Sequence, residues 1–252
     1  MNKKCILEVE GLSKHFGGIK AVDNFDIKLY NGEIIAIVGD NGAGKSTLIK
    51  IISGVYKKDS GKIYINNEEC VINNPDDAKN YGIETVYQDE GLIQILDASS
   101  NLFLGREKVR NDILGKLFKF VDYKYMRSEA EGLLGRFKIK IKNIDGEVSA
   151  LSGGQRQAVV VGRAVYWGKK VIILDEPTNN LGVNEQRQTI NLIKQLRDEY
   201  GMSIIIITHN LYHVFELVDR IIVIKNGKKV GERVKNETTT NEIVSMITGI
   251  AV

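Results

Sequence analysis

The chain has 252 residues, of which 43% are hydrophobic and 27% charged, and its net charge is +3. These values are typical of one large globular α/β domain, alone or with a subdomain, and the charge is too small to indicate nucleic-acid binding by itself. Cys5 and Cys70 make neither a disulfide framework nor a metal-ligand pattern, so we expect a reducing compartment. The first ten residues lack the apolar core of a signal peptide, and no apolar run approaches the roughly 18 residues that span a bilayer. We therefore expect a soluble or peripheral protein.

The N-terminal part of the chain predicts a small sheet followed by a strand and a helix. Residues 5–30 alternate in polarity, which predicts antiparallel strands with a turn at Gly17-Gly18. Residues 34–38 are all apolar and predict a buried strand. Residues 45–53 carry apolar residues at helical spacing and predict a helix that ends near Gly54.

The loop between that strand and helix has the pattern G-x-x-x-x-G-K-[ST]. In this context the pattern predicts a phosphate-binding loop, because glycines let the backbone wrap around phosphate oxygens and the helix N-terminus offers unpaired N–H groups. We expect Lys45 to reach the β- and γ-phosphates and the Ser46 hydroxyl to bind Mg²⁺. The predicted nucleotide-binding residues here are Gly39, Asp40, Asn41, Gly42, Ala43, Gly44, Lys45, Ser46 and Thr47.

A second set of short elements follows. Residues 62–65 predict a strand with a hairpin turn after it, and Pro75 opens a short helix that ends near Gly82. Residues 83–87 predict another short strand, and Gln88 stands at its end. A glutamine at the end of a strand could contact Mg²⁺ or water and report its presence to neighbouring segments, so we include it among the candidate nucleotide and metal ligands.

The segment 97–142 differs in character from what precedes it. Between residues 105 and 142 it carries 11 Lys/Arg and 5 Asp/Glu, a local charge of +6. Its apolar residues are spaced as amphipathic helical stripes: Leu102, Phe103, Leu114, Leu117 and Phe118. We therefore predict an inserted helical subdomain, whose basic excess either suits anionic lipid headgroups or is a solvated lysine-rich face.

The motif L-S-G-G-Q follows at residues 151–155 and precedes a helical pattern. Its residues Ser152, Gly153, Gly154 and Gln155 make a second candidate anion-binding helix terminus. A simple helix cap without a ligand is the alternative. Since one chain has no obvious need for two phosphate-facing helix ends, this one is best explained by a nucleotide bound to a second subunit.

An acidic pair follows the next buried strand, residues 171–174. We expect Asp175 to contact Mg²⁺, through water, and Glu176 to act as general base on the attacking water. The alternative is an acid that caps the following helix. Residues 203–208 predict another strand, and His209 at its end could hold the attacking water and sense the γ-phosphate.

The remaining elements complete a mostly parallel sheet. Helices are predicted at 184–200 and 211–218, a strand at 220–224, a hairpin turn at Asn226-Gly227, and a closing helix at 238–248. Strands that alternate with helices imply parallel pairing. The predicted fold class is thus α/β of the P-loop NTPase type, with a mostly parallel core sheet, an N-terminal antiparallel β-subdomain and an inserted α-helical subdomain.

Taken together and in this order, the motifs resemble the nucleotide-binding subunits of the ATP-binding cassette (ABC) family. The resemblance covers residues 5–249 and implies a helical subdomain at about 97–165. It further implies a head-to-tail dimer that sandwiches two ATP molecules between the L-S-G-G-Q motif of one subunit and the phosphate loop of the other. It assigns Phe16 to adenine stacking, with a core position in the N-terminal sheet as the alternative. It also implies that the segment after Gln88 forms the surface that contacts a membrane subunit.

One position departs from the family pattern. Gly182 stands where the family usually has Asp in the loop after Pro177-Thr178, which puts the details of coupling between subunits in doubt. The segment around it, together with residues 85–89, 101–107 and 240–249, is similar to cassettes of bacterial ribose-, xylose- and fructose-type importers.

The resemblance implies an ATPase that energises monosaccharide uptake from the cytoplasmic face of the inner membrane. The implied partners are a second ATPase subunit, most simply a homodimer, transmembrane permease subunits and, indirectly, an extracytoplasmic sugar-binding protein. Nucleic acid is not among them. An importer of another solute such as amino acids is the first alternative. A soluble ABC ATPase is the second, although no coiled-coil insertion, cysteine cluster or second phosphate loop favours it.

Overall fold

A computed structural model describes residues 4–87, 91–137, 139, 141, 143–168 and 170–250. The contacts divide the chain into two compact units. Unit 1 comprises Met1–Gln88, Gly168–Pro177 and Ile193–Val252, and unit 2 comprises Asp89–Trp167 and Thr178–Leu192. Unit 2 extends beyond the helical subdomain predicted at about 97–165, since it begins at Asp89 and also includes Thr178–Leu192.

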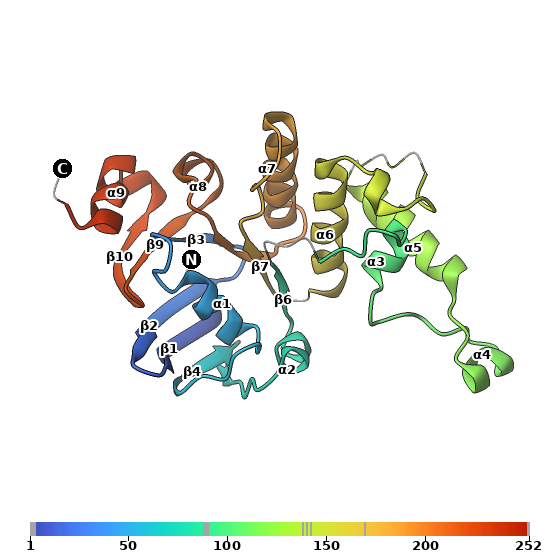
Figure 1. The fold of residues 1–252 in the computed structure, drawn as a ribbon, viewed down its shortest axis with the longest axis horizontal. Helices are drawn as coiled ribbons and strands as arrows, with labels where there is room; N and C mark the ends of the chain where they lie inside the picture. Colours follow the sequence, from blue (N-terminus) through green and yellow to red (C-terminus); the bar gives the residue numbers. More distant parts are fainter. Residues whose placement is uncertain are drawn as a thin grey trace. The chain divides into compact units, whose positions relative to one another are not determined.

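Unit 1 contains a six-stranded sheet with the order β10-β9-β3-β8-β7-β6 (Figure 1). All neighbouring pairs are parallel except β9 and β10, which form the predicted hairpin. Its strands are β3 (Ile34–Val38), β6 (Ile83–Val86), β7 (Val171–Asp175), β8 (Ser203–Ile207), β9 (Arg220–Lys225) and β10 (Lys228–Val234). Every residue of β3, β7 and β8 is buried, which is why these strands are continuous apolar runs.

A four-stranded sheet with the order β2-β1-β4-β5 completes the β-structure of unit 1. Its strands are β1 (Cys5–Phe16), β2 (Ile19–Tyr30), β4 (Ser60–Ile65) and β5 (Glu68–Glu69), and they pair antiparallel. The turn at Gly17-Gly18 is confirmed, since β1 ends at Phe16 and β2 begins at Ile19. Among the described residues, the helices that lie wholly in this unit are α1 (Lys45–Ile52), α2 (Pro75–Asn80), α8 (Leu211–Leu217) and α9 (Thr240–Thr248).

One hydrophobic core joins the antiparallel sheet, α1 and one face of the six-stranded sheet. In β3 the side chains of Ile35 and Ile37 enter this core, and in β8 those of Ile205 and Ile207 do the same. Leu48 and its apolar neighbours on α1 pack into it as well. Because α1 is held on both sides by buried strands, its N-terminus has a fixed position at the carboxyl end of β3.

Unit 2 is built from helices, as predicted. They are α3 (Ala98–Leu102), α4 (Ile113–Phe118), α5 (Tyr123–Arg136) and α6 (Gly153–Trp167), and the first part of α7 (Val183–Asp198) also belongs to it. Phe103 is fully buried and contacts the rings of Tyr125, Tyr166 and Trp167 edge-on. Two short 3-10 turns, Val148–Ala150 and Lys235–Glu237, complete the described secondary structure.

The apolar stripes predicted in this segment have two different fates. Leu102 and Phe103 are buried, whereas Leu114, Leu117 and Phe118 on α4 are exposed. Throughout the described residues, no helix combines the length and the apolar character needed to cross a membrane.

Candidate nucleotide-binding and hydrolysis site

The loop between β3 and α1 can be formed only with glycine at two of its positions. Gly44 has φ +108°, and a Cβ there would lie 2.3 Å from the carbonyl oxygen of Ala21. A Cβ on Gly39 would lie 2.2 Å from the carbonyl oxygen of Ile224. Both contacts are with backbone, which cannot give way, so these glycines allow the loop to lie tightly against β2 and β9.

The N-terminus of α1 is arranged to receive an anion. Gly44 occupies the cap position without a side-chain hydrogen bond, so the first N–H groups of α1 have no capping partner. The ammonium of Lys45 is buried and donates hydrogen bonds to the carbonyl oxygens of Gly39 and Asp40, at 2.7 and 2.8 Å. Burial lowers the pKa of Lys45, while the nearby carboxylates of Glu176 and Asp175 oppose this shift.

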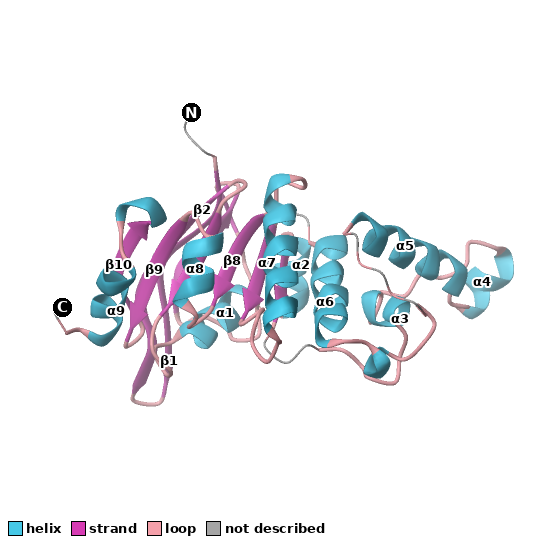
Figure 2. Ribbon diagram, turned by 90° about the horizontal axis from the view of Figure 1, so that it is seen from above, coloured by secondary structure: helices cyan, strands magenta, loops and turns pink. Residues whose placement is uncertain are grey.

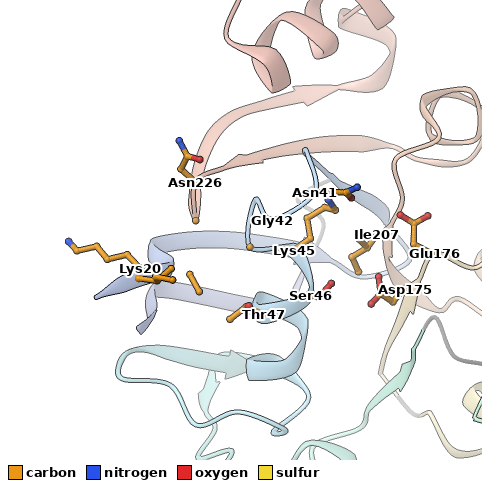
Figure 3. Close-up of a pocket in the computed structure, with 14 residues that line it drawn as sticks. Lys20, Asn41, Gly42, Lys45, Ser46, Thr47, Asp175, Glu176, Ile207 and Asn226 are labelled. Carbon is orange, nitrogen blue, oxygen red and sulfur yellow. The ribbon is translucent and has the colours of Figure 1, made fainter. Parts of the chain in front are cut away.

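This loop forms one side of a cavity of about 460 Å³ that lies within unit 1. Figure 3 shows the carboxylates of Asp175 and Glu176 at one side of it, beyond Lys45 and Ser46, and Lys20 and Asn226 at the opposite side. The lining residues are Ile19, Lys20, Ala21, Asn41, Gly42, Gly44, Lys45, Ser46, Thr47, Asp175, Glu176, Ile207, Asn226 and Gly227.

The acidic pair reaches the cavity because of the order of the strands. β8 lies between β3 and β7, and Asp175 at the end of β7 pairs with Ile207 at the end of β8. The next N–H, that of Glu176, donates to the carbonyl oxygen of Ile207 at 2.8 Å. Burial in the first place, and the neighbouring Glu176 charge in the second, raise the pKa of Asp175 to about 6. The carboxyl ends of the parallel strands therefore gather negative charge beside the phosphate loop.

Glu176 and His209 are in direct contact. Glu176 Oε1 lies 2.8 Å from His209 Nδ1, a hydrogen-bonding distance. Glu176 has φ +52°, a left-handed conformation that is unfavourable for a residue with a Cβ. Its side chain is 12% exposed, whereas that of His209 is 66% exposed. The turn after β7 thus holds the Glu176 carboxylate at the cavity in a conformation that the rest of the fold imposes.

The remaining sequence-predicted residues of this site have different positions. Phe16 ends β1, is 43% exposed, and contacts the ring of Tyr56 edge-on at 5.3 Å, with Lys14 Nζ 5.6 Å from its own ring centroid. This exposure argues against a core position for Phe16, and Phe16 does not line the cavity described above. Gln88 lies outside the described residues.

The turn between β9 and β10 supports the phosphate loop, which the sequence pattern did not indicate. The N–H of Gly227 donates to the carbonyl oxygen of Ala43 at 2.8 Å, and the N–H of Asp23 donates to the carbonyl oxygen of Gly227 at 2.9 Å. The pair Asn226-Gly227 was interpreted only as a hairpin turn. The sequence does not show that Gly227 also supports the phosphate loop, because the two segments are far apart in the chain.

The L-S-G-G-Q motif forms the N-terminus of α6 in unit 2. Ser152 Oγ accepts from the N–H of Gln155 at 3.2 Å, and Gln155 Oε1 accepts from the N–H of Ser152 at 3.0 Å, which is a reciprocal capping box. The N–H of Gly154 donates to Glu185 Oε1 at 3.1 Å, and the N–H of Gly182 donates to Glu185 Oε2 at 3.1 Å. These two backbone hydrogen bonds lower the pKa of Glu185.

Glu185 is therefore the carboxylate that links the motif to the loop containing Gly182. Sequence reasoning used Glu185 only as part of a subgroup pattern. An acidic residue in the first turn of α7 was the available signal, because such a residue can accept from the free N–H groups of a helix start. That signal does not reveal that the carboxylate also reaches a second helix.

A family model described as ABC transporter matches residues 22–179, from β2 to the loop after β7. The chain belongs to the ABC transporter family. As a member of this family it is a cassette that binds and hydrolyses ATP. The resemblance drawn from the phosphate loop, the acidic pair and L-S-G-G-Q is thus confirmed.

Among relatives of this ABC cassette, the xylose/arabinose import ATP-binding protein XylG of Sulfolobus acidocaldarius is 44% identical over 98% of this chain and 95% of its own length. The fructose import ATP-binding protein FrcA of Rhizobium meliloti is 42% identical over 99% and 96%. The ribose import ATP-binding protein RbsA of Caldanaerobacter subterraneus is 38% identical, and the match covers 97% of this chain but only 48% of that longer protein.

Solved structures of ABC cassettes have the same fold. The ADP conformation of MJ1267, an ATP-binding cassette of an ABC transporter, is 29% identical with a TM-score of 0.82, covering 97% of this chain and 99% of that one. The dimeric structure of the cassette MJ0796 bound to ADP and phosphate is 26% identical with a TM-score of 0.74, covering 91% and 99%. The predicted P-loop NTPase fold class is confirmed.

Proposed function

We propose that this ABC ATPase energises the import of a monosaccharide. The observation that carries the proposal is its 44% and 42% identity, over nearly the full length of each chain, to cassettes named for import of xylose/arabinose and of fructose. Further relatives named as a ribose import ATP-binding protein and a galactofuranose transporter ATP-binding protein support the same substrate class. The cassette supplies energy, and the solute is handled by other subunits.

ATP binds in the unit 1 cavity, with its phosphates against the N-terminus of α1. The backbone N–H groups of the loop from Gly39 to Thr47 surround the phosphate oxygens. Lys45 exchanges its two carbonyl partners for the β- and γ-phosphate oxygens, which are stronger acceptors because they are charged. The exposed ring of Phe16 stacks on adenine.

The residues at the cavity fit Mg²⁺. Ser46 and Asp175 both line it, and their hydroxyl and carboxylate oxygens are the ligands that Mg²⁺ prefers. The raised pKa of Asp175 indicates buried negative charge that lacks full compensation. When bound, Mg²⁺ would neutralise this charge and that of the phosphates. Gln88 is the further proposed ligand.

Glu176 acts as the general base and His209 orients it. The carboxylate lies at the cavity, where it can accept the proton of the attacking water. His209 contacts the same carboxylate at 2.8 Å and so restricts its rotation. We assign both residues to the hydrolysis step on this geometry.

The site is completed by a second cassette. The residues Ser152, Gly153, Gly154 and Gln155 belong to unit 2, and we propose that they contact ATP held by the partner subunit, most simply in a homodimer. The dimeric structure of the related cassette MJ0796 supports this arrangement. ATP binding closes the dimer since each nucleotide then touches both subunits, and hydrolysis releases it.

The proposed partners beyond the second cassette follow from the transport role. They are transmembrane permease subunits, with which the cassette is peripherally associated at the cytoplasmic face of the inner membrane, and an extracytoplasmic sugar-binding protein that delivers the solute to them.

The proposal is tested by deleting the gene from its host and measuring uptake of radiolabelled xylose, ribose and fructose, with an amino acid as control. Complementation with the wild-type gene should restore uptake of one sugar, and complementation with the Glu176→Gln variant should not. Loss of amino-acid uptake with all sugar uptake intact would overturn the substrate class. Tagged chain should also copurify with a multi-helix permease from gently solubilised membranes.

A further inference from the structure

The helix α4 has its apolar face turned to solvent. Ile113, Leu114, Leu117 and Phe118 are between 60% and 84% exposed, and we call these four residues the α4 face. They lie at i, i+1, i+4 and i+5, so they share one side of the helix. A surface helix of a globular domain normally turns such a stripe inward. The neighbouring α5 does so, with Met126, Ala130, Leu133 and Leu134 buried.

The outward orientation is built into the backbone of the segment. Gly115 is the buried residue of α4, and a Cβ there would lie 2.5 Å from Arg110 Cβ and 2.6 Å from its carbonyl oxygen. The side of α4 with no side chain therefore packs on residue 110, which leaves the four large side chains on the opposite side. Asp112 Oδ1 caps the helix by accepting from the N–H of Gly115 at 2.7 Å.

The segment that carries α4 is a closed hairpin of defined structure. Val109 and Val121 form an antiparallel bridge, the N–H of Arg110 donates to the carbonyl oxygen of Phe120 at 2.9 Å, and the N–H of Asp122 donates to that of Lys108 at 2.7 Å. Within unit 2, α4 lies beyond the N-terminal end of α5 and apart from α3 and α6 (Figures 1 and 2). The α4 face is thus held in place by its own hairpin.

The charges around the α4 face are mainly positive. Residues 108–124 contain five basic residues, Lys108, Arg110, Lys116, Lys119 and Lys124, and two acids, Asp112 and Asp122, so the segment carries +3. Both acids are engaged, since Asp112 pairs with Arg110 at 2.5 Å and Asp122 caps α5. Lys116, Lys119 and Lys124 are exposed. Exposed aromatic rings at Phe120 and Tyr123 flank the same helix.

We infer that the α4 face inserts into the headgroup region of an anionic lipid bilayer, as a contact of the cassette itself with the membrane. An apolar helix face with adjacent lysines and aromatic rings matches such an interface in both hydrophobicity and charge. A protein partner would complement the charge of these lysines only if its own surface were acidic. The inference does not depend on which solute is transported, since it concerns lipid and this chain alone.

The test is flotation of the purified full chain with lipid vesicles. One set contains phosphatidylcholine alone, and the other contains about 30 mol % phosphatidylglycerol. We expect binding to the anionic vesicles that weakens as salt is raised. Ile113→Ser/Leu117→Ser should lower the partition coefficient at least about tenfold, because two large apolar side chains no longer enter the bilayer. Lys116→Gln/Lys124→Gln should lower it about tenfold or more, at roughly fivefold per lysine.

The matched control is Val71→Ser/Val230→Ser, which removes two exposed apolar side chains from unit 1 and should leave flotation unchanged. ATP hydrolysis and thermal unfolding report folding for each variant, and both should match wild type. Absence of binding to anionic vesicles, or binding that the α4 variants do not weaken, would overturn the inference. A third result would also overturn it. If the wild-type chain does not bind vesicles and Ile113→Ser/Leu117→Ser loses permease copurification or self-association, the α4 face contacts a protein partner.

Discussion

Glu185 Oε1 accepts a hydrogen bond from the N–H of Gly154 at 3.1 Å, so a carboxylate of the chain itself occupies a donor at the start of α6. The same N–H is one that we propose contacts the γ-phosphate of ATP on a second subunit. A carboxylate and a phosphate are both anions and cannot share one N–H donor in full. We therefore expect Glu185 and the partner-bound nucleotide to compete.

Replacing Glu185 with Gln should make dimerisation easier, because an amide oxygen is a weaker acceptor than a carboxylate. In a Glu176→Gln background, which prevents hydrolysis, we expect the ATP concentration for half-maximal dimerisation to fall about threefold to tenfold. Light scattering during an ATP titration measures this. Glu237→Gln, at an exposed glutamate of unit 1, is the matched control. If the Glu185→Gln variant instead needs more ATP than its parent for half-maximal dimerisation, Glu185 acts mainly by positioning the L-S-G-G-Q motif.

The Glu176→Gln substitution alone should separate binding from hydrolysis. The amide has the shape of the carboxylate but cannot accept the proton of the attacking water, so we expect turnover to fall at least about 100-fold. ATP affinity, measured by fluorescence of a nucleotide analogue, should stay close to wild type. Hydrolysis at the wild-type rate would exclude the general-base role.

The Lys45→Ala substitution should act on binding itself. The buried ammonium is proposed to move from two carbonyl oxygens to phosphate oxygens, and its loss should weaken ATP affinity about tenfold to 100-fold. Equilibrium dialysis with labelled ATP measures the dissociation constant. Lys57→Ala, at an exposed lysine of the same unit, should leave that constant unchanged. Undiminished affinity of Lys45→Ala would remove this residue from the phosphate site.

The elements that depend on local sequence were predicted closely. β3 has the bounds predicted for it, and α1 ends within one residue of the expected position. A run of apolar residues and a glycine pattern are enough for this, because buried parallel strands and close backbone turns admit few other residues. The gathering of Asp175, Ser46 and Lys45 at one cavity also followed, since carboxyl ends of parallel strands meet at one edge.

What sequence could not give depends on contacts between distant residues. Glu185 reaches Gly154 across 31 positions, and Gly227 supports Ala43 from the far end of the chain. The amphipathic stripes of residues 97–142 illustrate a second limit. Helical spacing marks Leu102 and Leu117 alike, yet the first is buried and the second is 71% exposed, because spacing cannot tell whether another element covers the stripe.

The Asp175→Asn substitution should stabilise the chain in the absence of Mg²⁺ and nucleotide, in a way that depends on pH. The pKa of Asp175 is about 6 in the folded protein against 3.8 ordinarily, so the folded state holds the proton more firmly than the unfolded state. The contribution of Asp175 to the free energy of unfolding therefore falls as pH rises from about 4 to about 6, and the full penalty persists above that range. Asn has no charge to bury, so the variant does not carry this penalty.

At pH 8 we expect Asp175→Asn to raise the melting temperature by about 3 to 8 °C, which corresponds to about 1 to 3 kcal/mol. At about pH 3 most of the gain should vanish, because the wild-type side chain is then mostly protonated in both states. Asp76→Asn removes a carboxylate that is 84% exposed and should show no such pH dependence. Addition of Mg²⁺ and ATP should stabilise wild type more than the variant, since the charged Asp175 carboxylate binds the cation more strongly than the neutral amide of Asn does. A variant that is less stable than wild type at pH 8 without ligand would mean that the buried charge is already compensated within the fold.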